Sequence, residues 1–161
     1  IRGTVAYAAQ QAMIFNATVR QNITLAQDFV IPPHMQETYD EVVRACQLQD
    51  DLDLFPAGDL TEIGERGVNL SGGQKQRISL ARAAYSGAEV VLLDDPLSAV
   101  DAHVGRALFD QLISDQGLLK DRTRVFVTHQ LQYLEGCAMC YAIDQGRVKS
   151  AGTHAELVAA G

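Results

Sequence analysis

The apolar residues of this chain follow two spacings, and each spacing predicts a different kind of element. Unbroken apolar runs at 90–93 and 125–127 predict buried strands, the first closed by Asp94 and Asp95 and the second followed by His129. Apolar residues at helical spacing predict three helices. The three sets are Met35, Tyr39, Val42, Val43 and Cys46; Ile78, Leu80, Ala81 and Ala84; and Val104, Leu108, Phe109 and Leu112. We therefore predict an α/β fold with a mostly parallel sheet.

Shorter patterns predict three further strands. Residues 1–7 read as a strand that precedes the first polar segment. Residues 138–143 and 147–151 read as two strands that flank the turn-prone residues 144–146, Asp-Gln-Gly. A hairpin is the expected result.

Polar residues mark the ends of two helices. Thr153 with Glu156 three residues later fits a capping box, which predicts a short helix at the end of the chain. Asp50, Asp51 and Asp53 follow the helix that carries Met35 to Cys46. We interpret these aspartates as its solvated end.

A second capping box opens the helix that carries Ile78. Ser71 and Gln74 have the required spacing, and Gly72 and Gly73 lie between them. The first N–H groups of a helix are unpaired and its dipole is positive there, while glycine lets an anion approach the backbone closely. The pattern predicts a phosphate site; an ordinary glycine-containing turn into a helix is the alternative.

Charged side chains follow both apolar strands. Ligands of open α/β sheets bind beyond the carboxyl ends of the strands, where Asp94, Asp95 and His129 stand. Carboxylate and phosphate oxygens are the ligands that Mg²⁺ prefers. We expect the two aspartates near a nucleotide and its Mg²⁺; a solvated strand end and a packed or surface histidine are the alternatives.

Composition fits one globular core and argues against some partners. The chain has 161 residues, 47% of them hydrophobic. A net charge of -7 and a pI near 4.9 argue against a nucleic-acid partner, because a groove for phosphates needs clustered Lys and Arg. No apolar run approaches the roughly 18 to 20 residues that cross a bilayer. Any membrane role is therefore expected to come through a partner segment.

The cysteines suit a reducing compartment better than a disulfide scaffold. Cys137 and Cys140 form a C-x-x-C, which in other proteins binds zinc or performs redox chemistry. A zinc site with four ligands requires a second pair, and the remaining cysteine is Cys46 alone. We interpret the C-x-x-C as strand packing.

In their order along the chain, these motifs resemble those of the nucleotide-binding domain of an ABC transporter. Gln10 resembles the Q-loop of that family, residues 70–74 (Leu-Ser-Gly-Gly-Gln) its signature, and residues 90–94 its Walker B strand. Residues 98–101 resemble the D-loop, and His129 resembles the H-loop. The common order of these motifs argues against chance.

Two segments resemble one subfamily in particular. Residues 10–23 and 94–101 are similar to the first nucleotide-binding domain of subfamily C, the multidrug-resistance-associated transporters, and residues 61–67 resemble the X-loop of exporters. The resemblance implies a P-loop NTPase-like core with an inserted helical subdomain. The implied parts are 1–21 and 87–161 for the core and about 22–86 for the subdomain.

The resemblance also implies which residues meet ATP and Mg²⁺. In the family, ATP lies between the Walker motifs of one domain and the signature of a second domain. Ser71 and Gly73 would therefore touch the γ-phosphate of a nucleotide that the partner domain holds. The implied nucleotide contacts are Ser71, Gly72, Gly73, Gln74 and Asp101; the implied metal ligands are Asp94 and Gln10; the implied catalytic residues are Asp95, His129 and Gln10.

Two features depart from the family pattern. The phosphate loop G-x-x-x-x-G-K-[ST] occurs nowhere in the sequence, so we expect a fragment of a longer transporter, truncated at its amino end, that binds nucleotide poorly alone. Asp95 stands where hydrolytic sites of the family carry Glu. Because Asp is one methylene shorter, we predict a degenerate site that binds ATP tightly and hydrolyses it slowly.

The resemblance implies ATP-driven efflux of organic anions, conjugates or drugs by an integral membrane protein, with this module on the cytoplasmic face. Its expected partners are a second nucleotide-binding domain and the transmembrane domains, whose coupling helix would lie near Phe15 and Glu62. Packing of Phe15 inside the domain is the alternative. A regulatory module of a subfamily C channel or receptor would carry the same motifs. A DNA-repair or chromosome ATPase is disfavoured, because those proteins separate Q-loop and signature by long insertions.

Overall fold

The structure, a computed structural model, describes residues 3–26, 30–65 and 67–160. It divides into two compact units, one reaching to Thr128 and the other beginning at His129, and each is described by itself. The predictions for residues 1–2 and for residue 66 lie outside the described residues. None of the described helices has the length and hydropathy of a bilayer-spanning segment.

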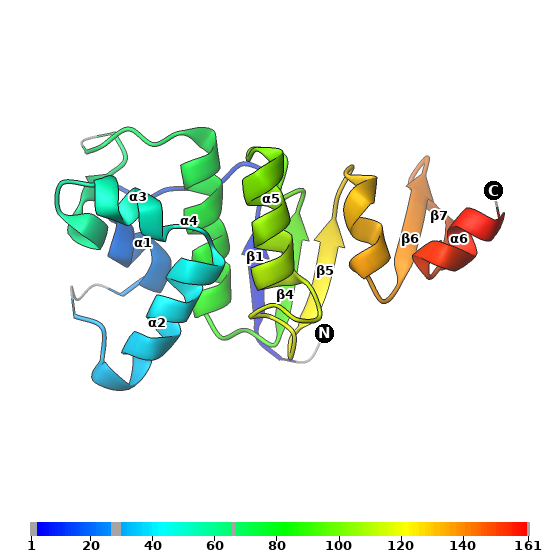
Figure 1. Cartoon of the computed structure of the whole chain (residues 1–161), viewed down its shortest axis with the longest axis horizontal. Helices are drawn as coiled ribbons and strands as arrows, with labels where there is room; N and C mark the ends of the chain where they lie inside the picture. The colour runs from blue at the N-terminus through cyan, green and yellow to red at the C-terminus, as the bar shows by residue number, and fades with distance from the viewer. Residues whose placement is uncertain (1–2, 27–29, 66, 161) are drawn as a thin grey trace. The chain divides into compact units, whose positions relative to one another are not determined.

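The first unit contains a three-stranded parallel sheet in which β4 lies between β1 and β5 (Figure 1). The strands are β1 (Val5–Ala8), β4 (Val90–Asp94) and β5 (Thr123–Val127). Tyr7 pairs with Leu92 of the central strand, and Leu92 pairs with Val125 on its other side. The predicted parallel sheet is therefore confirmed, and the carboxyl ends of the strands point the same way.

The two faces of this sheet differ in exposure. Ala8, Val91 and Leu93 are at most 1% exposed and form the packed face. Because side chains alternate along a strand, the residues between them line the opposite face. There Val5, Tyr7, Val125 and Val127 are between 47% and 59% exposed. One face of the sheet is thus a core surface, and the other presents apolar side chains to solvent.

Helices and two very short strands make up most of the rest of the first unit. They are β2 (Ala17–Thr18), α1 (Val19–Thr24), α2 (Pro33–Ala45), α3 (Gln49–Leu54), η1 (Gly58–Leu60), β3 (Glu62–Ile63), α4 (Gly72–Tyr85), α5 (Ala102–Leu108) and η2 (Phe109–Ile113). The described residues of the segment 22–86 are largely helical, and the status of this segment as a separate subdomain remains a prediction.

The helix predicted to carry Val104 and Leu112 is α-helical only as far as Leu108. It continues as the π-helical turn η2, in which the N–H of Ser114 donates to the carbonyl of Phe109 at 2.7 Å. The apolar residues Leu108 and Leu112 are both fully buried. The pattern therefore located the buried face, while the wider turn follows from hydrogen bonding that the pattern does not encode.

Helix α4 is the central helix of this unit. Its inner face carries Ile78, Leu80 and Ala81, which are at most 1% exposed. It packs on α1, α2 and β1. At its far end, the ring of Tyr85 meets that of Tyr39 of α2 edge to face, with centroids 6.0 Å apart. Burial of the helix on several sides fixes where its first turn points.

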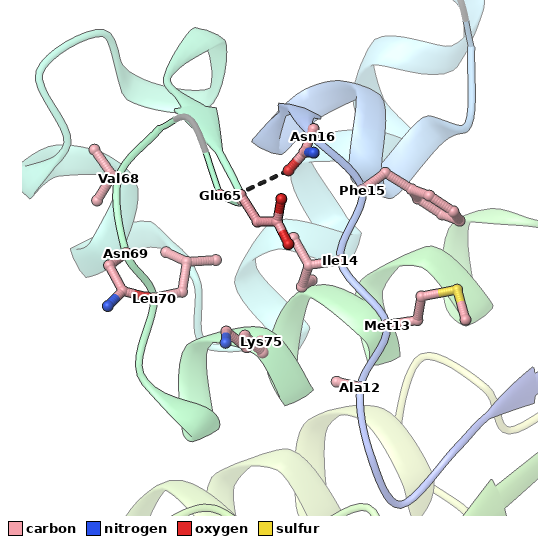
Figure 2. A pocket seen from close by; sticks show the side chains of 11 residues that line it. Ala12, Met13, Ile14, Phe15, Asn16, Glu65, Val68, Asn69, Leu70 and Lys75 are labelled. Carbon is pink, nitrogen blue, oxygen red and sulfur yellow. Dashed lines mark hydrogen bonds between the residues drawn. The ribbon is translucent and has the colours of Figure 1, made fainter.

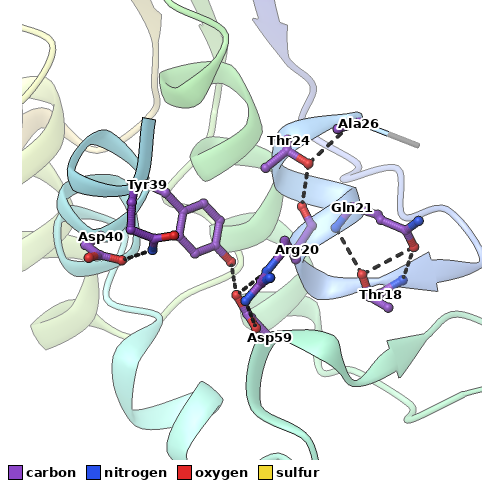
Figure 3. A network of polar contacts seen from close by, with 9 residues as sticks. Thr18, Arg20, Gln21, Thr24, Ala26, Tyr39, Asp40 and Asp59 are labelled. Carbon is purple, nitrogen blue, oxygen red and sulfur yellow. Dashed lines mark hydrogen bonds and ion pairs between the residues drawn. The ribbon is translucent and has the colours of Figure 1, made fainter. Parts of the chain in front are cut away.

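A polar network joins α1, α2 and η1 (Figure 3). Arg20 donates through two nitrogens to the carboxylate of Asp59, at 2.8 and 2.9 Å, and the hydroxyl of Tyr39 donates to the same carboxylate at 2.9 Å. Burial raises the pKa of Tyr39, and the neighbouring Asp59 carboxylate raises it further. Because a bidentate pair has a fixed geometry, Asp59 fixes the positions of α1, α2 and η1 relative to one another.

The interpretation of Asp51 as part of a solvated helix end is wrong. Residues 49–54 form the separate helix α3, and Asp51 is only 9% exposed. Its carboxylate forms an ion pair with Arg77 of α4 at 2.9 Å. Acidic residues in a run are normally exposed to solvent. Asp51 is buried because Arg77, a basic residue on another helix, pairs with it.

The second unit contains a hairpin and two short helical segments. They are η3 (Leu131–Gly136), β6 (Cys140–Asp144), β7 (Arg147–Gly152) and α6 (His154–Ala160). The predicted hairpin is confirmed, and its turn residues Gln145 and Gly146 both have positive φ, at 47° and 74°. The predicted capping box is confirmed as well, since Glu156 accepts from the N–H of Thr153 at 2.8 Å.

All three cysteines are free thiols. Cys46 follows α2 and is fully buried, which raises the pKa of its thiol. Cys140 opens β6 and is also buried, whereas Cys137 is half-buried. Among the described residues there is no cluster of three or more metal-binding side chains.

Candidate functional site

Asp94 ends the central strand and faces β1. Its carboxylate accepts a hydrogen bond from the hydroxyl of Tyr7 at 2.8 Å, and this bond raises the pKa of Tyr7. The register of β1 on β4 brings the two together, because Tyr7 pairs with Leu92, two residues before Asp94 on the same face. Tyr7 was not predicted as a site residue.

Asp95 follows with a backbone conformation that few residues adopt. Its φ is 45°, in the left-handed region, where Asp and Asn are the most common residues after Gly. Its N–H donates to the carbonyl of Val127 at 2.9 Å, which ties the end of β4 to the end of β5. The side chain of Asp95 is buried, with 7% of it exposed.

One carboxylate oxygen of Asp95 has a partner and the other does not. Gln10, just after β1, donates through Nε2 to Oδ2 at 3.4 Å, a long hydrogen bond. Oδ1 is buried without a hydrogen-bond partner among the described residues. A buried carboxylate oxygen without a donor is costly, so a further donor or a cation at this oxygen would lower the free energy of the site.

The oxygen donors around Asp95 fit Mg²⁺ in part. Mg²⁺ in proteins is usually held by one or two carboxylates together with phosphate oxygens and water. Asp94 and Asp95 carry carboxylates at this edge of the sheet, and Gln10 carries an amide whose nitrogen is directed toward Asp95. Among the described residues, too few of these side chains gather here to hold the ion alone.

A second candidate site lies at the start of α4. Ser71 is the N-cap: its Oγ accepts from the N–H of Gln74 at 3.2 Å, and Gln74 Oε1 accepts from the N–H of Ser71 at 2.9 Å. The predicted capping box is confirmed. The N–H groups of Gly72 and Gly73 have no acceptor within the helix, because they belong to its first turn.

Gly72 and Gly73 differ in their surroundings. A Cβ on Gly72 would meet no heavy atom within 4 Å, whereas a Cβ on Gly73 would lie 3.1 Å from the carbonyl oxygen of Ala99. Ser71 and Gly72 are exposed. The first turn of α4 is therefore open to an approaching anion at Gly72, while Gly73 lets the segment before Asp101 pack closely.

Asp101 is the N-cap of α5. One of its carboxylate oxygens accepts from the N–H groups of His103 and Val104, both at 3.0 Å. These bonds, that of Val104 foremost, lower the pKa of Asp101. The start of α4 and the start of α5 thus lie close together through Gly73 and Ala99.

The segment that follows Gln10 is held by α4. Arg82 donates through Nε to the carbonyl of Asn22 at 2.7 Å and through Nη1 to that of Met13 at 2.9 Å, and its guanidinium lies 4.9 Å from the ring centre of Phe15. Asn22 in turn accepts from the N–H of Phe15 at 2.8 Å. The segment therefore has a defined shape although it contains no helix or strand.

A groove of about 640 Å³ opens between this segment and the loop before α4 (Figure 2). The N–H of Glu65 donates to Asn16 across it at 2.9 Å. Gly64, at a φ of 106°, is needed beside Asn16, because a Cβ would overlap that side chain. Met13 and Phe15 are 66% and 45% exposed, so the groove has an apolar rim.

The order of these sites is matched by a known family. The sequence model of the family described as ABC transporter matches residues 1–98 of the chain. The chain belongs to the ABC transporter family. The matched part includes the segment of Gln10, the start of α4 and the end of β4.

Relatives within the ABC transporter family belong to one group. Multidrug resistance protein mrp-7 of Caenorhabditis elegans is 49% identical over 158 residues, which cover 98% of the chain and 10% of the relative. ATP-binding cassette sub-family C member 2 of Homo sapiens is 46% identical over 159 residues, covering 99% and 10%. The predicted resemblance to subfamily C is confirmed, and the chain spans about a tenth of the length of these relatives.

The ABC transporter motifs are brought together in two places within the first unit. Gln10 meets Asp95 beyond the ends of β1 and β4, Asp94 ends β4 and bonds Tyr7, and Gly73 of the signature lies beside Ala99. His129 is the first residue of the second unit and is exposed, and its role stays a prediction. The assigned roles of the other motif residues are likewise predictions.

Sequence reasoning missed several residues that hold the ABC transporter motifs in place: Tyr7, Asp51, Gln76 and Arg82. Gln76 is 1% exposed and donates to the carbonyl of Ala9 at 3.2 Å. The available signal was a Gln or an Arg within an otherwise apolar helical pattern, because such side chains need partners when they pack against the protein.

Proposed function

We propose that the chain is part of the ATP-binding and ATP-hydrolysing module of a subfamily C ABC exporter. In this proposal, ATP binding and hydrolysis drive efflux of organic anions, conjugates or drugs through transmembrane domains, with the module on the cytoplasmic face. The observation that carries the proposal is the start of α4, where a capped first turn is open to solvent at Ser71 and Gly72.

The start of α4 suits a phosphate that another protein domain holds. Its N–H groups and its helix dipole attract an anion, and Ser71 adds a hydroxyl. The side chains needed to grip a whole nucleotide are not found in residues 70–74. Ser71 and Gly73 would therefore contact the γ-phosphate of ATP bound mainly to a second nucleotide-binding domain, and Asp101 would face that domain.

Gln10, Asp94 and Asp95 would serve the nucleotide of this half. Asp94 and Gln10 would hold Mg²⁺, which neutralises phosphate charge when bound, and Asp95 would orient the attacking water, with His129 near the γ-phosphate. The backbone of Asp95 supports the idea of a slow site. A left-handed φ is more common for Asp than for Glu, so the backbone conformation at position 95 favours the shorter carboxylate.

The groove beside Phe15 would receive the transmembrane partner. Its apolar rim at Met13 and Phe15 and its tie to the signature helix through Arg82 are features expected of a surface that transmits movement. In the full-length protein, Met13→Asp should lower substrate-stimulated ATP hydrolysis and leave the basal rate in place. Equal loss of both rates, or of neither, would reject this role for the groove.

The proposal is tested at Gly72 in the full-length transporter. Gly72→Asp places a carboxylate in open space on the path of the phosphate, and Gly72→Ala is the matched control that adds a Cβ without charge. We expect Gly72→Asp to lower ATP turnover by at least about tenfold, because like charge opposes the γ-phosphate. Unchanged turnover in Gly72→Asp would reject the role of α4.

The slow site is tested by Asp95→Glu and Asp95→Asn in the same protein. Glu restores the longer base and should raise single-site turnover of this half by about tenfold or more, while Asn keeps the shape and should lower it. The left-handed backbone is expected to cost the Glu variant about 1 kcal/mol of stability. If turnover does not rise in a folded Glu variant, the shortened base is not the cause.

A further inference from the structure

Asp51 lies behind the signature, on a different helix. Although it is part of an acidic run on α3, its carboxylate is buried against α4 and meets two side chains there. Gln74 donates through Nε2 to Oδ1 at 2.8 Å, and Arg77 Nη2 lies 2.9 Å from Oδ2. Each carboxylate oxygen of Asp51 therefore faces one residue of the first two turns of α4.

Both of those side chains also bind the backbone of residues 71–73. Gln74 accepts from the N–H of Ser71 at 2.9 Å through Oε1, the other end of the amide that Asp51 binds. Arg77 donates through Nε to the carbonyl of Gly73 at 3.4 Å, and through Nη1 to the carbonyl of Gln47. Asp51 therefore contacts the backbone that would touch a phosphate indirectly, through the side chains of Gln74 and Arg77.

Asp51 sets the orientation of the side-chain amide of Gln74. An amide has an accepting oxygen at one end and a donating NH₂ at the other, and the two can exchange by rotation. An ionised carboxylate only accepts, so Asp51 holds the NH₂ of Gln74 toward α3 and leaves the oxygen toward Ser71. In the opposite orientation, an NH₂ would oppose the N–H of Ser71, and half of the capping box would be lost.

We propose that Asp51 is a positioning residue for the phosphate-contacting turn of α4, acting through Gln74 and Arg77. This inference rests on the proposed role of α4 in binding the γ-phosphate. Removal of the carboxylate should loosen Ser71 and Gly73 without removing any group that touches the nucleotide. The effect should therefore depend on whether the nucleotide has a γ-phosphate.

The experiment uses the full-length transporter in lipid vesicles with MgATP and ADP as probes. Asp51→Asn is compared with Asp53→Asn, a change on the same helix at a residue that bonds Gln49 of its own helix at 2.9 Å. We expect Asp51→Asn to raise the MgATP concentration for half-maximal turnover about tenfold, as small displacements of a binding group do. The inhibition constant of ADP should not change, and Asp53→Asn should resemble the wild type.

A reciprocal swap separates positioning from general damage. Gln74→Glu alone sets two carboxylates side by side and should be the most impaired variant. In the double variant Asp51→Asn with Gln74→Glu, the amide introduced on α3 donates where Asp51 accepted, and the carboxylate introduced on α4 still accepts from Ser71. The net charge beside Arg77 is kept, so half-saturation by MgATP should move back from the value of Gln74→Glu toward the wild-type value. Because Gln74 is itself a predicted nucleotide contact, recovery is judged against Gln74→Glu alone. If Asp51→Asn alone does not fold, the double variant still decides.

Three results would overturn the inference: equal effects of Asp51→Asn and Asp53→Asn, a parallel loss of ADP binding, or no recovery in the double variant. The proposed function fails separately. If Gly72→Asp leaves turnover unchanged, α4 has no phosphate to position; if Gly72→Asp is impaired and Asp51→Asn is not, only the role of Asp51 is rejected.

Discussion

At the scale of single residues, the two signature glycines are expected to tolerate a methyl group differently. Gly72→Ala meets open space, and alanine in a helix should stabilise the chain by about 0.5 kcal/mol or more. Gly73→Ala sets its Cβ 3.1 Å from the carbonyl oxygen of Ala99, so it should be less stable than Gly72→Ala by about 1 kcal/mol. Urea unfolding of both variants measures the difference. Equal stabilities would mean that the backbone at Ala99 yields without cost.

The sequence predicted where Ser71, Asp94 and Asp95 stand in the fold but neither their conformations nor their partners. Asp94 and Asp95 were placed correctly at a strand end, since an apolar run closed by charge is a strong pattern. The left-handed φ of Asp95 depends on its hydrogen bond to Val127, a residue of another strand. Asp51 was misread for the same kind of reason, because its partner Arg77 lies on another helix.

At the scale of elements, Arg82 is the main polar link from α4 to the segment after Gln10. Arg82→Lys should lower the free energy of unfolding by about 2 to 3 kcal/mol. Lys has no planar guanidinium, so it cannot donate to the carbonyls of Met13 and Asn22 at the same time. Burial also lowers the pKa of Arg82, so its hydrogen bonds are needed to offset the cost of burying the charge.

The matched control for Arg82 is Arg106→Lys. Arg106 forms an exposed ion pair with Asp110 within one helical segment, with side chains 65% and 47% exposed. Its replacement should change stability by no more than about 0.5 kcal/mol. Urea denaturation followed by circular dichroism measures both. Similar values for the two variants would show that the link from α4 to this segment adds no stability.

Elements were predicted well where local pattern and tertiary packing agree. The capping box fixed the start of α4, and the apolar runs fixed β4 and β5, because caps and burial act on neighbouring residues. The prediction was wrong at α3, where Gln49–Leu54 form a helix of their own that local polarity did not suggest. The ion pair of Asp51 with Arg77 of α4 contributes to that stabilisation, and no local pattern reports it.

At the scale of the whole molecule, the exposed sheet face should make the isolated chain associate. Val5, Tyr7, Val125 and Val127 form an apolar surface, and such surfaces favour self-association or dye binding. Val125→Thr with Val127→Thr keeps β-branched side chains and should lower both the fluorescence of a hydrophobic dye and the mean sedimenting mass. Leu54→Thr, at an apolar residue 83% exposed on α3, is the control. Equal effects of the two changes would reject a role for this face.

The rates at which the two buried thiols are modified report how often each compact unit opens. Cys46 lies in the first compact unit and Cys140 in the second, and both are buried in the folded chain. A thiol reagent can modify them only after local or global opening, so each rate of modification reports the opening free energy of its own unit. Each rate is divided by the rate of the same thiol in the unfolded chain. Equal ratios for Cys46 and Cys140 would mean that the two units open together. Different ratios would give a separate opening free energy for each unit, without any added label.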